Sequence, residues 1–278
     1  MDKDQFWQLL KTEFGYQSSP GRPSIMARGS RWRTSVYYLR LCAHLYRQSL
    51  ISKRGEMDTD RWAEASLAVI RIVESVGGRV HVSGLEGVHR HDGPLVYVAN
   101  HMSLLETFVL PCVTLAFNRV TFIIKEELLR YPIIKHIMHA VNLIAVSRQN
   151  PRQDLKVVLQ EGRKFIADGC SVVVFPQATR SVMFDIEKFN SLGVKLASNA
   201  GVPVVPIAIK TDFQGNGKWI KDMGPIDPRK TLYFKFGPPM AVEGKGRQVH
   251  QHVVDFITHN LRAWGGEVRE SESPSRNR

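Results

Sequence analysis

Cysteine is scarce in this chain, and the few cysteines form no recognisable pattern. Cys42, Cys112 and Cys170 stand far apart without a Cys-x-x-Cys pair, and at least the last two lie in apolar runs. An odd number of dispersed cysteines does not make a disulfide framework, so we expect reduced thiols and a reducing compartment. The first ten residues carry acids and no long apolar core, so we also expect no secretory signal.

Long apolar runs are missing as well, since no run approaches the ~18 to 20 residues that cross a bilayer. The longest candidate, residues 104–117, contains Glu106 and Pro111. We interpret it as a buried helix with a bend. We therefore expect a chain that does not span a membrane, while a soluble state and peripheral membrane binding both stay open.

Signals for three other kinds of site are absent. Six histidines form close pairs, namely His89 with His91, His136 with His139, and His250 with His252. No acid or cysteine stands at ligand spacing from these pairs, so we expect ordinary histidines and no metal. Residues 244–247 lack the third glycine of a nucleotide-binding loop, and there is no Gly-x-Ser-x-Gly elbow of a serine nucleophile.

Basic residues outnumber acidic ones. The 278-residue chain holds 38 lysines and arginines against 26 acids, a formal net charge of +12 at pH 7. An electropositive surface attracts phosphates, whether in nucleic acid, in anionic lipid head groups or in coenzyme A. Charge by itself does not choose among these partners, and the length is sufficient for a sizeable core.

Helical spacing of apolar residues characterises the first 79 residues, which we assign to an N-terminal helical region. Helices are expected over residues 3–14, 32–50 and 60–76. The intervening residues 17–30 are rich in Ser, Pro, Gly and Arg and predict a solvated crossover.

The second of these helices mixes apolar and basic side chains. The apolar ones are Trp32, Val36, Tyr37, Leu39, Leu41 and Leu45, and the basic ones in and before the helix are Arg28, Arg31, Arg33, Arg40 and Arg47. This mixture suits the interface of an anionic membrane, so we expect peripheral binding at the cytoplasmic face. Alternatively, the helices pack their apolar face on the rest of the protein and leave the arginines in water.

After residue 80, short runs dense in Val, Ile and Phe alternate with helical stretches. The runs are residues 95–99, 120–124, 143–146, 171–175 and 202–209. Strands covered on both faces have this composition. We therefore expect an α/β domain over residues 80–266, in which helices flank a mostly parallel or mixed central sheet. The polar residues 267–278 are expected to form a disordered tail.

Three further elements are expected in this domain. Asn150 can cap a helix that begins at Pro151, runs to residue 168 and is ended by Gly169. Residues 232–236 alternate apolar and polar side chains, as in a half-exposed edge strand. A last helix is expected over residues 247–264.

A candidate catalytic pair follows the first strand of the domain. Asn100 and His101 come directly after residues 95–99, at the kind of strand end where open α/β sheets place reactive groups. Glu106 stands five positions later, which on a helix leaves two side chains ~140° apart. His101 must therefore precede the helix if the two are to meet. A histidine oriented by a carboxylate can act as a general base.

Glu106 also has a purely structural interpretation. Ser103 and Glu106 have the spacing of a capping box, which would explain the carboxylate without catalysis. Likewise, a histidine at this position can simply close a turn. The capping and catalytic roles of Glu106 are compatible.

A second loop leaves another predicted strand. It reads Phe175-Pro176-Gln177-Ala178-Thr179-Arg180-Ser181. Hydroxyl and guanidinium donors in such a loop could hold a phosphate. Two reactive-looking turns that leave strands of one sheet suggest two halves of one site.

Four blocks occur in the order of a known family. They are Asn100-His101 with Glu106; Lys125, Leu128 and Pro132 followed by Ser147-Arg148; residues 175–181; and residues 202–206. With these blocks the chain resembles the lysophospholipid acyltransferase family, also called the 1-acylglycerol-3-phosphate acyltransferase family. The resemblance covers residues 80–239.

The resemblance implies transfer of a fatty acyl group from acyl coenzyme A or acyl carrier protein to a hydroxyl of a lysophospholipid, without any further cofactor. It implies that His101 is the general base and that Glu106 orients it, raising the imidazolium pKa above ~6.5. It further implies that Thr179 and Arg180 hold the phosphate, while Lys125 and Arg148 add charge. The other motif positions are Asn100, Ser103, Phe175, Pro176, Gln177 and Ser181.

Three positions, in two of the motif blocks, depart from the family pattern. Glu106 replaces an aspartate, and Gln177-Ala178 replaces Glu-Gly. These changes keep open another lipid acceptor, such as a lyso-aminolipid or a glycolipid. A second class of function is a non-catalytic basic module that binds anionic membranes or nucleic acid. The leading interpretation includes an anionic membrane surface and no nucleic acid.

Overall fold

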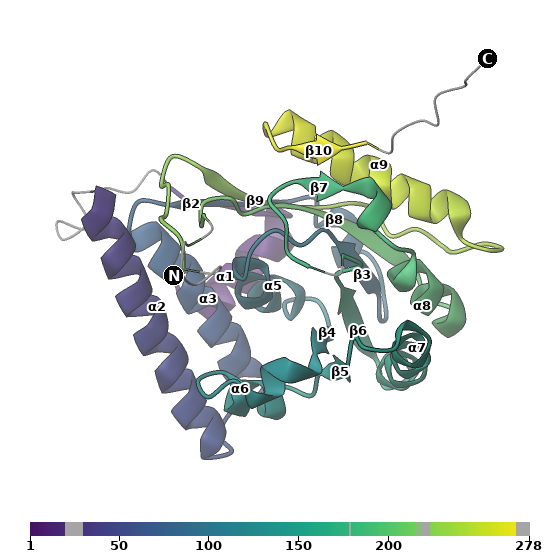
Figure 1. The fold of residues 1–278 in the computed structure, drawn as a ribbon, viewed down its shortest axis with the longest axis horizontal. Coiled ribbons are helices and arrows are strands. Elements are labelled where there is room, and N and C mark those ends of the chain that lie inside the picture. The colour runs from purple at the N-terminus through teal and green to yellow at the C-terminus, as the bar shows by residue number, and fades with distance from the viewer. Residues whose placement is uncertain (20–29, 178, 216, 218–222, 271–278) are drawn as a thin grey trace.

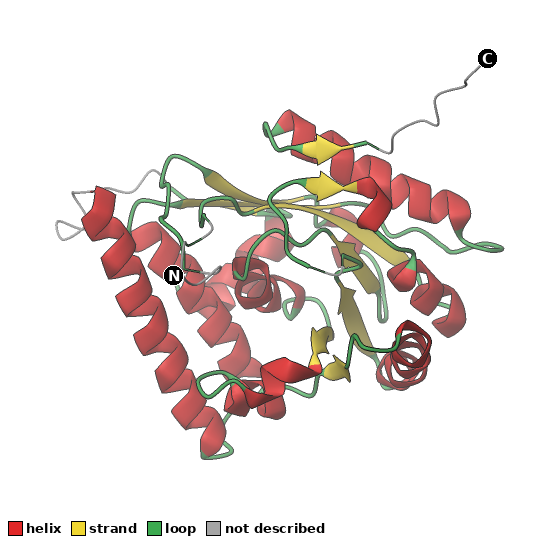
Figure 2. Cartoon of the chain, in the orientation of Figure 1, coloured by secondary structure: helices red, strands yellow, loops and turns green. Residues whose placement is uncertain are grey.

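The fold is seen in a computed structural model, which describes residues 1–19, 30–177, 179–215, 217 and 223–270. Helices lie on both faces of a central sheet (Figures 1 and 2). This is the expected α/β architecture, and the predicted helices and the five predicted runs all form within a few residues of their expected bounds.

Among the described residues, eight strands form one sheet in the order β1-β2-β9-β8-β3-β6-β4-β5. The strands are β1 (Tyr16–Gln17), β2 (Arg79–Ser83), β3 (Val96–Ala99), β4 (Arg119–Lys125), β5 (Ile144–Val146), β6 (Cys170–Val174), β8 (Val204–Lys210) and β9 (Thr231–Phe236). All neighbours pair in parallel except β1 with β2 and β8 with β9. The sheet is therefore mixed and mostly parallel.

The described helices cover the two faces of the sheet unequally. They are α1 (Lys3–Thr12), α2 (Ser30–Lys53), α3 (Thr59–Ser75), α4 (Glu86–His89), α5 (Leu105–Thr114), α6 (Lys135–Ala140), α7 (Pro151–Ala167), α8 (Leu192–Ala200) and α9 (Arg247–Ala263). One core joins α1, α2, α3 and α5 to the sheet, and a second core joins α7, α8 and α9 to it. In Figure 1, α2 lies outermost, with α3 between it and α5.

The N-terminal region shares its core with the sheet and is not entirely helical. Phe6, Tyr37 and Ile70 belong to the same buried cluster as Val205 of β8. Gln17, which was expected in a crossover, pairs in β1, while residues 20–29 lie outside the described part of the chain. The strand β2 spans the expected boundary at residue 80.

Local sequence explains the start of α7. The side chain of Asn150 accepts hydrogen bonds from the backbone of Arg152 and Gln153, and Pro151 opens the first turn. The expected cap is confirmed. Because α7 returns the chain from β5 to β6, this cap also helps to set where the loop after β5 ends.

The predicted edge strand is not at an edge. Residues 231–236 form β9, which lies between β2 and β8. The predicted alternation is confirmed, since Leu232, Phe234 and Phe236 are buried. The other side of β9 belongs to a face of the sheet that is only partly covered, where Trp264 stacks on Tyr233 with ring centroids 4.7 Å apart. The alternation therefore indicated a partly exposed face and not an edge position.

The end of the described chain also differs from the expected tail. Val268–Arg269 forms β10, which pairs in parallel with β7 (Phe184–Asp185). Residues 271–278 lie outside the described residues. The three cysteines are free thiols. Within the described ranges, no helix combines the length and the apolarity that crossing a bilayer requires.

Candidate active site

The predicted site residues lie where parallel strands end. His101 follows β3, the 175–181 loop follows β6, and Arg148 follows β5. Lys125 is the last residue of β4. Because β3, β6, β4 and β5 run in parallel, their carboxyl ends meet at one edge of the sheet. The topology therefore gathers four segments that are far apart in sequence.

The backbone of His101 is held by both neighbouring loops. Its N–H donates to Gln177 Oε1 at 2.7 Å, and its carbonyl accepts from the N–H of Ser181 at 3.0 Å. The Asn100 side chain pairs with the backbone of Ile209 in both directions at 2.8 Å. The first and third motif blocks are thus hydrogen-bonded to each other.

The imidazole of His101 precedes α5, as the helix geometry required. Its ring stacks on Phe175 with centroids 4.3 Å apart. Its Nδ1 lies 3.9 Å from Glu106 Oε2, which is adjacent but longer than a hydrogen bond. Only 13% of the histidine side chain is exposed.

Glu106 is fully buried and accepts four hydrogen bonds. Two come from the backbone of Met102 and Ser103, at 2.6 and 2.7 Å. Two come from the hydroxyls of Ser103 and Thr211, at 3.0 and 2.9 Å. The capping interpretation is therefore right in part, because Ser103 Oγ also accepts from the N–H of Leu105 at 3.1 Å. The same carboxylate lies beside His101.

Cationic side chains stand close to the imidazole. Arg148, Thr179, Arg180 and Lys125 line one cavity together with His101. Arg148 adopts a left-handed backbone conformation with φ of 59°. Lys125 Nζ lies 2.6 Å from Glu127 Oε2, so a carboxylate offsets part of its charge. The planar donor forks of the two arginines suit a phosphate better than the ammonium group of Lys125 does.

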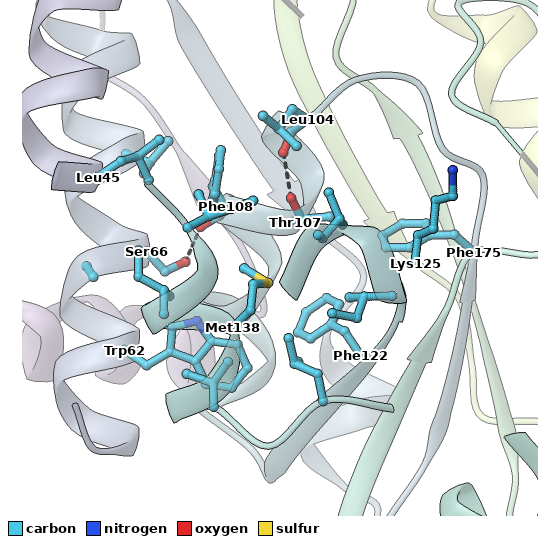
Figure 3. Close-up of a pocket in the computed structure, with 18 of the residues that line it drawn as sticks. Leu45, Trp62, Ser66, Leu104, Thr107, Phe108, Phe122, Lys125, Met138 and Phe175 are labelled. Atoms are coloured by element: carbon cyan, nitrogen blue, oxygen red, sulfur yellow. Dashed lines mark hydrogen bonds between the residues drawn. The ribbon is translucent and has the colours of Figure 1, made fainter. Parts of the chain in front are cut away.

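This cavity has a volume of about 310 Å³ and extends away from the polar groups between α2, α3, α5, α6 and β4. Figure 3 shows Leu45 and Trp62 at one side of it and Lys125 and Phe175 at the other. Most of the lining is apolar, including Phe108, Phe122 and Met138.

The hydroxyls along the cavity wall bond within the protein. Ser66 Oγ donates to the Phe108 carbonyl at 2.5 Å, and Thr107 Oγ1 donates to the Leu104 carbonyl at 2.8 Å (Figure 3). With these groups satisfied, the wall presents hydrocarbon to whatever occupies the cavity.

Comparison with known proteins supports the family that the four motif blocks indicated. Residues 79–210 match a family described as Acyltransferase. A 1-acyl-sn-glycerol-3-phosphate acyltransferase of Pseudomonas aeruginosa is 28% identical over 88% of this chain and 93% of that protein. A probable 1-acyl-sn-glycerol-3-phosphate acyltransferase of Mycoplasma genitalium is 34% identical over 66% of this chain and 68% of that protein. The chain belongs to the 1-acylglycerol-3-phosphate acyltransferase family.

The fold of this acyltransferase is shared with a solved structure. The crystal structure of the 1-acyl-sn-glycerophosphate acyltransferase PlsC of Thermotoga maritima superposes with a TM-score of 0.60 at 21% identity, over 87% of this chain and 98% of that one. The expected fold class and the suspected family are both confirmed.

The expected direction of the His101 pKa is wrong. Burial, followed by the charges of Arg180 and Arg148, lowers the pKa of His101 to about 3. Burial also raises the pKa of Glu106. Loss of hydration and the charges of two nearby arginines lower the His101 pKa more than the Glu106 carboxylate raises it. That carboxylate accepts hydrogen bonds from Met102, Ser103 and Thr211 and makes none with His101. The imidazole of this acyltransferase is therefore neutral near pH 7.

Sequence analysis missed one residue of the site and most of the cavity. Thr211 follows the last residue of β8 and donates to Glu106, and its position directly after a buried strand was an available signal. The lining contributed by α2, α3 and α6 had no motif to indicate it. Pro176 accepts from Asn190 Nδ2 at 2.5 Å, while Ala178 lies outside the described residues.

No metal was expected in this acyltransferase. Within the described ranges, no three His, Cys, Asp or Glu side chains cluster as metal ligands.

Proposed function

We propose that this acyltransferase moves a fatty acyl group from a thioester to the hydroxyl of a lysophospholipid related to 1-acylglycerol-3-phosphate, with His101 as the general base. The observation that carries the proposal is that a mostly buried imidazole and two arginines line the same largely apolar cavity. The arginines suit the phosphate of the acceptor, and the cavity suits a hydrocarbon chain. Relatives named for this acceptor supply its identity.

The chemistry requires a base but no covalent enzyme intermediate. The acceptor hydroxyl gives its proton to His101 as its oxygen attacks the thioester carbonyl carbon. The carbon–sulfur bond then breaks, the thiolate leaves with the electron pair, and the imidazolium returns the proton to it. Since Nδ1 is the ring nitrogen that lies near Glu106, Nε2 is the nitrogen we assign to the substrate.

The low pKa of His101 is compatible with this role. Two of its causes are the charges of Arg180 and Arg148. A phosphate bound to these guanidinium groups offsets their charge and thereby makes the imidazole more basic. The base would then gain strength when the acceptor arrives.

Gln177 performs its structural task without a charge. Its amide oxygen accepts from the His101 backbone at 2.7 Å, a bond that a carboxylate oxygen would make equally well. We therefore infer that the change from glutamate leaves acyl transfer intact. Its effect on acceptor choice is measured in the assay below.

The experiment supplies purified protein with acyl coenzyme A or acyl carrier protein donors and a panel of lysophospholipids, lyso-aminolipids and glycolipids. Released thiol and lipid product are followed. We expect turnover with 1-acylglycerol-3-phosphate, and a loss of about 10² to 10⁴ in kcat for His101→Ala. Glu106→Gln should also lower kcat.

The exposed His252 provides the matched control. His252→Ala should retain full activity. Equal turnover by wild type and His101→Ala would remove the base assignment. Turnover with only a lyso-aminolipid or a glycolipid would show that the acceptor is that lipid and not a lysophospholipid. A protein that is inactive with every donor and acceptor would support the alternative of a non-catalytic binding module.

A further inference from the structure

The end of the apolar cavity away from His101 is polar. His44 and Gln48, one turn apart on α2, line it beside Leu45 and Met57. The same two residues, with Ala65 of α3, also line a second cleft of about 610 Å³. The hydrocarbon-lined cavity thus adjoins a separate space at His44 and Gln48.

The tautomer of His44 follows from its one hydrogen bond. Its Nε2 lies 2.9 Å from the carbonyl oxygen of Ala65. A carbonyl can only accept, so Nε2 carries the hydrogen, and Nδ1 of the neutral ring is an acceptor. Burial, opposed by that hydrogen bond and assisted by the charge of Arg47, lowers the pKa of His44, which keeps the ring neutral.

Two polar groups at this end lack partners in the protein. Within the described part of the chain, neither His44 Nδ1 nor the side-chain amide of Gln48 makes a hydrogen bond. Elsewhere along the cavity the hydroxyls of Ser66 and Thr107 are bonded internally. The distal end therefore offers a ligand both a hydrogen-bond acceptor, His44 Nδ1, and a donor, the Gln48 amide.

The adjoining cleft gives this end access to water. Arg47, Arg54 and Arg61 line it together with Glu56 and Glu64. Arg61 pairs with Glu56 at 2.8 Å. A polar substituent that reaches His44 and Gln48 can thus stay hydrated, whereas a plain methyl end displaces water from both groups and returns no hydrogen bond.

We propose that His44 and Gln48 form a polar subsite that selects an acyl chain bearing a hydroxyl far from its thioester. The chain hydroxyl would donate to His44 Nδ1 and accept from the Gln48 amide. The inference rests on the proposed function, in which the thioester lies near His101 and the chain fills the cavity. The opposite placement of Leu45 and Phe175 in Figure 3 makes the recognised position a distal one.

The test uses acyl coenzyme A donors of one chain length, unsubstituted or carrying one hydroxyl at positions moved along the chain. The measured quantity is the ratio of kcat/KM for each hydroxylated donor to that for the unsubstituted donor. In wild type this ratio should peak at one distal position. Gln48→Met should lower the ratio at that position about tenfold.

Two further variants make the result specific. Met57→Leu exchanges one apolar lining residue for another and should keep the wild-type ratio. His44→Leu should also abolish the peak. Since His44 bonds to Ala65 and thereby joins α2 to α3, Gln48→Met remains the decisive variant if His44→Leu does not fold.

The outcomes separate the two proposals. A ratio that is flat along the chain, or equal in wild type and Gln48→Met, overturns the polar subsite while acyl transfer stands. Failure of every donor, hydroxylated or not, overturns the proposed function and this inference with it.

Discussion

Glu106 illustrates how one residue can stabilise the local structure and also lie beside the proposed base. Its buried carboxylate closes the turn before α5 through Met102 and Ser103, and the same group lies beside the histidine. Glutamate in place of the family's aspartate reaches these donors from the first turn of the helix. The longer side chain is thus accommodated within the cap.

Thr211 is a positioning residue for this arrangement. Its hydroxyl donates to Glu106 at 2.9 Å, and its oxygen lies 2.9 Å from the hydroxyl oxygen of Ser103. We predict that Thr211→Val lowers kcat about tenfold with little change in the KM of the acceptor, because it frees the carboxylate to move. Thr211→Ser should restore activity. Steady-state kinetics on the three proteins check the prediction, and an unchanged kcat for Thr211→Val would contradict it.

The low pKa of His101 has a consequence for stability. In the unfolded chain the imidazole takes up a proton near pH 6.5, whereas in the folded protein it does so near pH 3. The unfolded state therefore binds more protons between these values, and the contribution of His101 to stability, present above pH 6.5, falls as the pH drops toward 3.

We accordingly predict that the free energy of unfolding, measured with urea, decreases more steeply from pH 6.5 to 4 for wild type than for His101→Gln. The difference in slope is at most about 1.4 kcal/mol per pH unit. Parallel stability curves for the two proteins would show that the folded-state pKa is not lowered.

At the scale of elements, α2 has two apolar faces. Tyr37 and Leu41 are buried in the core, whereas Trp32, Leu39 and Tyr46 are 59%, 72% and 61% exposed. The exposed three are spaced by seven residues and therefore lie on one side of the helix. The face of α2 with Tyr37 and Leu41 packs on the protein, as the alternative to membrane binding predicted. The face with Trp32, Leu39 and Tyr46 is exposed and can contact a membrane.

Arginines accompany this exposed side. Arg33, Arg40 and Arg47 each follow one of the three exposed residues directly. Arg28 lies outside the described residues, as does the side chain of Arg31. We propose that α2 binds an anionic membrane, with the arginines near the lipid phosphates and the apolar side chains in the interface. Such a contact would put the acyltransferase at the cytoplasmic face of the membrane as a peripheral protein.

Flotation with anionic liposomes tests this contact. Wild type should float at low salt and less at high salt, and Leu39→Glu with Tyr46→Glu should reduce the bound fraction at least tenfold. Gln160→Glu, on the exposed side of α7, is the control for an added negative charge and should float like wild type. Absence of wild-type flotation at any salt concentration would end the membrane proposal.

At the scale of the molecule, the site depends on how parallel strands are ordered. His101, Arg148 and Arg180 come from loops after β3, β5 and β6, which are separated in sequence by helices. Each strand is short and buried, so its apolar composition was visible in the sequence. The order of strands within the sheet was not, because pairing depends on which faces α3, α5, α7 and α9 cover.

The sequence by itself determined the main strands and helices, the two motif loops and the family, because apolar periodicity, helix caps and contiguous motifs are local properties. Only the tertiary structure decided the interior place of β9, the part played by Thr211, the direction of the His101 pKa, and a cavity that runs from His101 to His44. Each of these arises where segments distant in sequence exclude water from one another, and burial of that kind leaves no pattern in a single segment.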